Sequence, residues 1–312
     1  MRAIDLFCGC GGLSLGLEKS GFEIAKAYDA WEAAIKCYRL NFQHEISATD
    51  LSDVKAAVAD IKPFHPDIIV GGPPCQDFSH AGKRNEGNRA DLTKAFAKIV
   101  TSVRPKWFLM ENVERAKSSL AYQSAKEIYE FAGYGLTEIV LDASFCGVPQ
   151  KRKRFFCIGR LGESAGFMEP FLRSNLTQAA MTVRQFLGSE LGLEHYYRHP
   201  RNYSRRAIFS IDEPAPTVRG VNRPVPSGYT GHQGDSAETN QVRALSTQER
   251  ARLQTFPKSF KWIGTKTDLE QIIGNAVPVN LAKFVGDAII KFELASVAQR
   301  IEVPILSEAV AA

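Results

Sequence analysis

The sequence contains no uninterrupted apolar run long enough to span a bilayer, although hydrophobic residues make up 44% of its 312 residues. Its first residues lead directly into a strand-like segment, without the basic, apolar and cleavage-site succession of a secretory signal. Charged residues make up 23%, close to the average for globular proteins. We therefore expect a cytoplasmic globular protein.

The six cysteines lack the paired CxxC spacing of zinc ribbons and the pattern of disulfide scaffolds. Cys8 and Cys10 are too close together and too isolated for an ordinary zinc knuckle, so packing within a glycine turn is the preferred interpretation. We expect reduced thiols and no metal site. Internal repeats and low-complexity segments are also absent from the sequence, which excludes a repeat architecture.

A formal net charge of +5 favours polyanionic partners only weakly, and the distribution of charge is more informative. Arginines are concentrated between residues 198 and 223, and a second basic group occupies residues 151–154. Both are candidate contacts to phosphates or bases, and solvated charge is the alternative for each residue taken singly. The first group consists of Arg198, Arg201, Arg205, Arg206, Arg219 and Arg223.

From residue 1 to about 160, short β-branched or aromatic runs alternate with longer amphipathic stretches, a pattern typical of βαβ units and a parallel sheet. Apolar residues at helical spacing predict helices over about 32–41 and 94–103. The expected strands lie near residues 2–8, 23–28, 45–49, 67–70, 106–110, 136–141 and 153–159.

The composition changes after residue 165, where Gly, Pro, Asn, Arg and Tyr become frequent and periodicity weakens. A capping box over residues 246–249 predicts a helix to about Thr255, and a final amphipathic helix is expected over about 280–296. We expect an α/β catalytic and cofactor-binding domain over 1–164, a smaller loop-rich domain over 165–242, a return segment over 243–300 that completes the first domain, and a tail over 301–312.

Three expected strand ends point to a nucleoside. The first strand ends in a glycine turn over residues 5–12, a geometry that lets a ligand approach backbone N–H groups. Asp29 follows the second strand and could accept from ribose hydroxyls, and Asp50 follows the third and could accept from an adenine amine. NAD and S-adenosylmethionine both satisfy this spacing. The absence of a basic residue from the turn favours a cofactor without a pyrophosphate.

Two further strand ends carry reactive groups. Cys75 follows a buried strand behind two prolines that fix the local backbone, which favours a nucleophile over a small buried hydrophobe. Glu111 ends the next strand in an apolar setting that should raise its pKa and let it donate a proton. The two-residue period of a strand would then place Gln150, Arg152 and Arg154 on one face.

Taken in order, these motifs resemble those of the cytosine-5 DNA methyltransferase family, including bacterial restriction-modification enzymes, over nearly the whole chain. The motifs are DLFCGCGG (5–12), Asp29, Asp50, GGPPCQDFS (71–79), ENV (111–113), QKRKR (150–154), RALSTQERARLQTFP (243–257) and GNAVP (274–278).

The resemblance implies a Rossmann-like S-adenosylmethionine-dependent methyltransferase sheet with a smaller loop-rich target-recognition domain. In its mechanism Cys75 attacks C6 of a flipped-out cytosine, and Glu111 binds and protonates N3. Arg152 would hold the O2 carbonyl, and Arg154 would support the catalytic loop and its thiolate.

The resemblance also implies a binding pocket for S-adenosylmethionine, with S-adenosylhomocysteine as product. The pocket residues would be Phe7, Gly9, Gly11, Asp29, Asp50, Leu51, Pro74, Leu92, Asn275 and Val277. The loop from residue 76 to about 89 has the composition of a lid over the DNA and contributes Ser79, Lys83 and Arg84 as DNA contacts. The arginines between residues 198 and 223 would add contacts to guanine or phosphate.

The partners expected from this resemblance are double-stranded DNA and a cognate restriction endonuclease that acts on the same site, with the chain itself a monomer. A tRNA cytosine-5 methyltransferase on the same scaffold is the nearest rival. A non-catalytic nucleic-acid-binding homologue would have no chemical reason to retain Cys75, Glu111 and Arg152 together. A dinucleotide oxidoreductase would give Cys75 and Glu111 no role.

Overall fold

The computed structural model of the chain describes residues 1–74, 90–202 and 204–308. Four of the predicted site residues, Cys75, Ser79, Lys83 and Arg84, lie outside the described residues.

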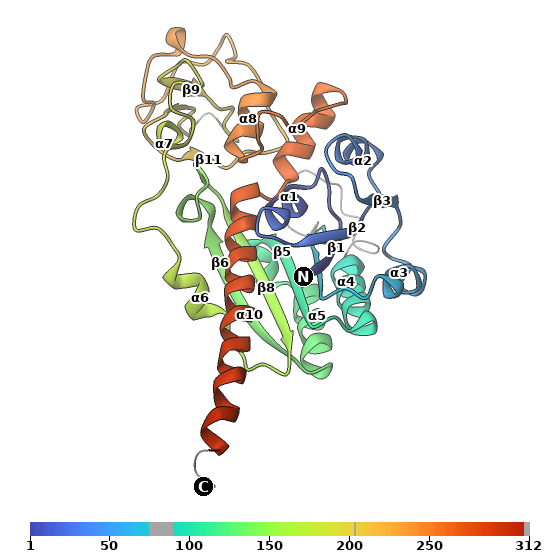
Figure 1. Cartoon of the computed structure of the whole chain (residues 1–312). Coiled ribbons are helices and arrows are strands. Elements are labelled where there is room, and N and C mark those ends of the chain that lie inside the picture. Colours follow the sequence, from blue (N-terminus) through green and yellow to red (C-terminus); the bar gives the residue numbers. More distant parts are fainter. Residues whose placement is uncertain (75–89, 203, 309–312) are drawn as a thin grey trace.

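A seven-stranded sheet forms the centre of the molecule, in the spatial order β3-β2-β1-β4-β5-β8-β6 (Figure 1). β8 runs antiparallel to both of its neighbours, and the other pairs are parallel. The chain changes direction across the sheet between β1 and β4, and ligands of such sheets bind at this point, beyond the carboxyl ends of the strands. All seven expected strands are present: β1 (Arg2–Leu6), β2 (Glu23–Asp29), β3 (Glu45–Ala48), β4 (Ile68–Gly71), β5 (Trp107–Val113), β6 (Tyr134–Asp142) and β8 (Lys153–Leu161).

Helices cover both faces of the sheet, and the alternation of side chains along the strands explains why. In β4, Ile68 and Val70 pack into a cluster with α1 (Gly12–Glu18) and α10 (Val279–Glu308), whereas Ile69 packs into a second cluster on the opposite face. The second cluster is closed by α3 (Val54–Ile61), α4 (Ala90–Val103) and α5 (Leu120–Phe131). Burial on both faces accounts for the continuous apolar run of this strand.

The region from 165 to 242 has little regular structure and lies mostly beyond one end of the sheet, whereas residues 169–174 at its start lie beside the sheet and pack into the cluster that contains α10 (Figure 1). Its elements are α6 (Glu169–Ser174), α7 (Val183–Leu187), β9 (His195–Tyr197), β10 (Ile208–Ser210) and β11 (Ala215–Pro216). Tyr197, Ile208 and Tyr229 belong to a small core of their own. Val183 and Tyr196 instead join a larger cluster with α2 (Glu32–Arg39), which fixes the region to the first domain.

The return segment contains α8 (Thr247–Leu253) and α9 (Lys266–Asn275) before α10. The capping box of α8 is confirmed, since the Ser246 hydroxyl accepts from Glu249 N and the Glu249 carboxylate accepts from Ser246 N. α10 is longer than expected and continues into the residues predicted to be a tail. No glycine follows Gly286 and no proline precedes Pro304 in this stretch, so nothing in the sequence ends the helix near 296. Among the described helices, none has the length and apolar character that a membrane crossing would need.

Candidate active site

The segment that leads to Cys75 is tied to β5 beside Glu111. Glu111 lies near the carboxyl end of β5 and is 7% exposed. A Cβ atom on Gly72 would lie 3.2 Å from Glu111 Oε2, so the absence of a side chain brings this backbone close to the carboxylate. The side-chain amide of the next residue, Asn112, donates to the Pro73 carbonyl at 3.0 Å. The Gly72–Pro73 backbone and the Glu111 carboxylate therefore meet at the carboxyl ends of adjacent parallel strands.

Glu111 forms an ion pair with Arg154 at the start of β8. The distance from Arg154 Nε to Glu111 Oε1 is 2.8 Å, and both side chains are largely buried. Burial raises the pKa of Glu111, although Arg154 and Arg152 act in the opposite direction. The carboxyl group therefore keeps its proton to a higher pH than an exposed glutamate and is suited to act as a proton donor.

Arg152 is buried and bonded to the backbone of two other segments. It is 1% exposed, and its guanidinium donates to three backbone carbonyls, those of Val218 (2.9 Å), Gly274 (2.9 Å) and Ala276 (3.1 Å). Its Nη1 and Nη2 atoms are thus engaged within the protein, and its Nε is buried without a hydrogen-bond partner. The chain leaves β7 (Gln150–Lys151), which pairs with β11, and enters β8 at Lys153, so Arg152 lies at the crossing between two sheets, near Glu111 and Arg154.

Two buried glutamines continue this connection, and the sequence interpretation gave neither of them a role. Gln150 donates to Gln254 Oε1 at 2.8 Å and accepts from Val218 N at 2.8 Å. Gln254 in turn donates to the carbonyls of Ile273 (2.6 Å) and Ala276 (3.1 Å). The motifs at 150–154, 243–257 and 274–278 thus meet in one hydrogen-bonded network.

At the neighbouring strand ends, Asp29 holds the glycine turn together. Asp29 Oδ2 accepts from Gly9 N at 2.7 Å and Oδ1 accepts from Trp31 N at 2.8 Å. Gly9 has φ +58°, and a Cβ atom there would meet nothing within 4 Å, so open space borders the turn. Phe7 also has a positive φ of 59°, which is rare for a bulky residue and is typical of constrained functional turns.

The other predicted cofactor residues differ in exposure. Gly11 is buried at the start of α1, and Val277 packs in the cluster that contains Leu13 of α1. Asp50 is exposed just beyond β3, whereas Leu51 is buried beneath it. The remaining three are Pro74 and Leu92, both partly buried, and Asn275, which is exposed.

The six arginines between residues 198 and 223 differ in their contacts. Arg206 forms an ion pair with Glu213, donates to Ser236 Oγ at 2.8 Å and stacks 4.3 Å from the ring centroid of Phe209. Its guanidinium is therefore engaged within the protein, and the expected DNA contact does not fit this conformation. Arg201, Arg205 and Arg223 are exposed, and Arg198 and Arg219 are partly buried.

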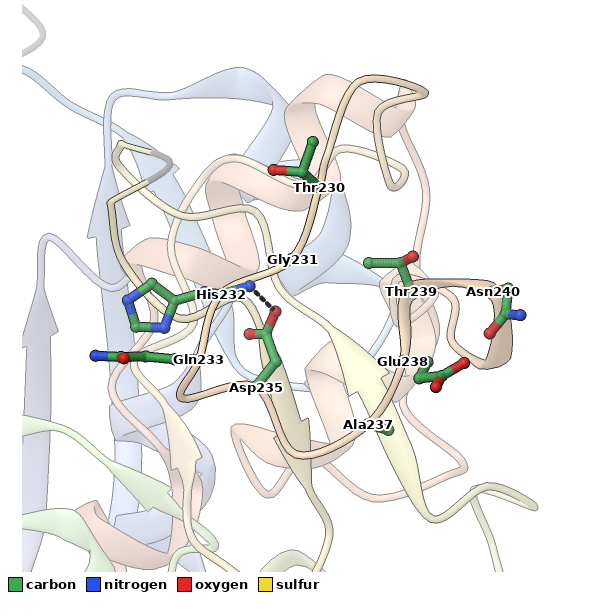
Figure 2. A pocket seen from close by; sticks show the side chains of 9 residues that line it. All are labelled: Thr230, Gly231, His232, Gln233, Asp235, Ala237, Glu238, Thr239 and Asn240. Atoms are coloured by element: carbon green, nitrogen blue, oxygen red, sulfur yellow. Dashed lines mark hydrogen bonds between the residues drawn. The ribbon is translucent and has the colours of Figure 1, made fainter.

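A separate open pocket of about 640 Å³ lies in the same region (Figure 2). Its lining residues are Thr230, Gly231, His232, Gln233, Asp235, Ala237, Glu238, Thr239 and Asn240. Asp235 fixes the turn by accepting from His232 N at 2.9 Å and from the Tyr229 hydroxyl at 2.6 Å. None of these lining residues is a predicted catalytic or cofactor residue, so this pocket is distinct from the site at β4 and β5.

The model of the family "C-5 cytosine-specific DNA methylase" matches residues 1–291. The chain is 59% identical over 296 residues to the type II methyltransferase M.HindV of Haemophilus influenzae, with 94% of this chain and 97% of the relative covered. It is 52% identical over 290 residues to the type II methyltransferase M.HgiDI of Herpetosiphon aurantiacus, with coverages of 93% and 94%. Among solved structures, the Dnmt2 methyltransferase of S. pombe shares the fold, with a TM-score of 0.70, 19% identity and coverage of 93% of this chain and 98% of that one.

Proposed function

The chain belongs to the C-5 cytosine-specific DNA methylase family and is a sequence-specific DNA cytosine-5 methyltransferase, and from this premise we propose that the reaction takes place at the carboxyl ends of β4 and β5. Cys75 is the nucleophile and Glu111 the proton donor. The observation that carries the proposal is the buried Glu111 carboxyl group, ion-paired with Arg154 and adjacent to the Gly72–Pro73 backbone that leads to Cys75.

The mechanism follows from the chemistry of cytosine, whose C5 atom is a poor nucleophile. The Cys75 thiolate forms a bond to C6, and the electron pair of the C5–C6 double bond moves to C5 while Glu111 gives its proton to N3. S-adenosylmethionine, when bound, supplies the electrophilic methyl group that C5 receives. The C5 proton is then lost, the bond from C6 to sulfur breaks, and Glu111 regains its proton as 5-methylcytosine is released.

Arg154 takes the substrate-facing role that the sequence pattern gave to Arg152. Its Nε is fixed 2.8 Å from Glu111 Oε1, and its Nη1 donates to the Lys153 carbonyl at 2.8 Å, so the guanidinium is held in place beside the acid. Such a fixed, charged donor suits the O2 carbonyl of the flipped base. Arg152 acts instead as a positioning residue through its three backbone contacts.

The strand ends of β1, β2 and β3 fit S-adenosylmethionine. Open space borders Gly9, and Asp29 has lone pairs beyond those used by its two backbone donors, so it can accept from the ribose hydroxyls. No basic side chain lies in the turn over residues 5–12, so nothing there would neutralise a pyrophosphate. Asp50, at the end of β3, is the acceptor for the adenine amine. The rest of the pocket comes from Phe7, Gly11, Leu51, Pro74, Leu92, Asn275 and Val277.

Double-stranded DNA is the substrate, with the target cytosine flipped out of the stack. The region over 165–242 reads the target sequence, and Ser79, Lys83 and Arg84, which lie outside the described residues, also contact the DNA. By likeness to the relatives named as type II methyltransferases, the chain is the modification enzyme of a restriction-modification system. It acts as a cytoplasmic monomer, and its partner is an endonuclease that cleaves the same site.

The test is methylation of mixed-sequence DNA by the purified protein with S-adenosylmethionine, read by bisulfite sequencing. Methylcytosine confined to one short motif is expected. Cys75→Ser should bind S-adenosylmethionine as the unaltered protein does and lose turnover by several orders of magnitude, because a hydroxyl is a far weaker nucleophile near neutral pH. Full activity of Cys75→Ser would exclude the covalent mechanism, and methylation of tRNA without methylation of DNA would contradict the proposed substrate.

A further inference from the structure

Two arginines of the recognition region are held side by side by the backbone of each other's segment. Arg198 Nη2 donates to the Thr217 carbonyl at 2.9 Å, and Arg219 Nη2 donates to the His199 carbonyl at 2.6 Å. Both line one small cavity together with Arg250 of α8. These reciprocal contacts fix the two side chains, so less conformational entropy remains to be lost when they bind a ligand.

We call Arg198, Arg201, Arg219 and Arg223 the arginine cluster. The positive charge of this cluster is largely uncompensated within the protein. Arg250 pairs with Glu270, but no aspartate or glutamate of the described residues forms an ion pair with Arg198, Arg201, Arg219 or Arg223. Burial and the neighbouring Arg219 lower the pKa of Arg198 to about 10, and burial and Arg201 lower the pKa of Arg219. In addition, Arg219 Nε is buried without a hydrogen-bond partner. Close like charges with unused donors are stabilised by a bound anion.

The cluster is joined to the active site through the backbone. Val218 precedes Arg219 in the chain. Its carbonyl accepts a hydrogen bond from Arg152, and its N–H donates to Gln150. The carbonyl of Arg219 itself accepts a hydrogen bond from the Arg250 guanidinium. A DNA group bound by Arg219 would therefore be held by a rigid segment that connects directly to the strand carrying Arg154, rather than by a free loop.

We propose that Arg198 and Arg219 bind one backbone phosphate of the DNA and that Arg201 and Arg223 contact adjacent phosphates, so that this cluster sets the position of the duplex independently of sequence. The cavity between the arginines has a volume of about 20 Å³, room for one water-sized group, so a phosphate oxygen fits and a nucleobase does not. A guanine edge would engage a single arginine, whereas successive phosphates can neutralise all four. This inference rests on the proposed function, because it assumes that DNA is the substrate.

The experiment measures equilibrium binding of the full chain to a duplex that carries the methylated motif and to an unrelated duplex, over a range of salt concentrations. The principal variant is Arg201→Gln with Arg223→Gln, because both side chains are exposed and make no described hydrogen bond that the fold requires. The plot of log binding constant against log salt concentration should become shallower by about 1.8 on both duplexes, since each phosphate contact contributes about 0.9.

The matched control removes two positive charges elsewhere. Arg173 and Lys258 are 63% and 70% exposed and pair with Glu169 and Glu190, and Arg173→Gln with Lys258→Gln should leave the salt slope unchanged. A central variant, Arg219→Gln, retains an amide that can donate to the His199 carbonyl and should lower the slope by less than about 0.9, because Arg198 still contacts the shared phosphate.

An unchanged slope for the Arg201/Arg223 variant, in a protein that methylates DNA, would overturn the phosphate assignment alone. Weaker binding of the motif duplex only, with the salt slope intact, would overturn it in favour of base reading. If the unaltered protein bound no duplex and methylated none, the proposed function would fail together with this inference.

Discussion

Replacing Arg152 with methionine should destabilise the folded protein, because the structure makes this side chain a connector between segments. Its guanidinium donates to carbonyls that belong to the recognition region, to the last turn of α9 and to the residue that follows α9. Methionine retains much of the apolar volume of the side chain and removes every donor. The substitution therefore separates a structural role from a role in substrate binding.

The magnitude follows from counting the acceptors left without a donor. The Ala276 carbonyl also accepts from Gln254, whereas no other described side-chain donor reaches the carbonyls of Val218 and Gly274. An unsatisfied buried acceptor costs about 1–3 kcal/mol, so the two together cost about 2–6 kcal/mol. Removing a buried charge recovers some of its desolvation cost, which places the expected loss at about 2–4 kcal/mol. That is a large share of the 5–15 kcal/mol that typically stabilises a folded protein.

The assay is urea unfolding followed by circular dichroism, with Arg154→Met as the comparison. Arg152→Met should unfold at a clearly lower urea concentration with an unchanged denaturant dependence. Arg154→Met should unfold nearer to the unaltered protein, because Glu111 can take up a proton when its partner is lost, but it should lose turnover through its position at the substrate. If Arg152→Met does not fold, Arg152→Lys should show a smaller loss in the same direction.

An Arg152→Met protein with the stability of the unaltered chain and a large loss of turnover would contradict this structural role. That result would indicate that Arg152 contacts the substrate. It would also require the contacts with Val218 and Gly274 to break when DNA binds.

Two further predictions concern buried carboxyl groups. Glu111→Gln should lower turnover by about 10²- to 10⁴-fold, because an amide can hydrogen-bond N3 but cannot protonate it. Because burial raises the pKa of Glu111, the activity of the unaltered protein should fall as the pH rises through that pKa. This alkaline decline should be absent from the residual activity of Glu111→Gln. A decline that persists in the variant would assign the titration to another group. Burial also raises the pKa of Asp5 from 3.8 to about 7, so between these values the folded state holds a proton that the unfolded chain has released. The free energy of unfolding should therefore decrease as pH rises from about 4 to about 7. Asp5→Asn should flatten this pH dependence, measured by urea titrations at several pH values. An unchanged pH dependence in the variant would contradict the assignment of the titration to Asp5.

Local sequence determined most of the fold. The alternating apolar runs predicted every strand of the central sheet, because strand propensity and burial act over a few residues. The capping box at residues 246–249 predicted the start of α8 for the same reason. The burial of Glu111 and its raised pKa also followed from the apolar strand that carries it. The length of α10 did not, because the amphipathic pattern fades near residue 296 whereas the helix continues to Glu308.

The assignment of side chains to partners was decided only by the tertiary structure. The two-residue period across residues 150–154 assumes one continuous strand, but the chain passes from one sheet to another at Arg152, whose guanidinium bonds to carbonyls of distant segments. The engagement of Arg206 by Glu213 and the absence of such a carboxylate at Arg198 and Arg219, among the described residues, likewise depend on which loops pack together. Hydrogen bonds and ion pairs act over a few ångströms between residues far apart in the chain. The sequence therefore determines which polar groups exist and on which elements they lie, and folding determines which of them remain available for DNA.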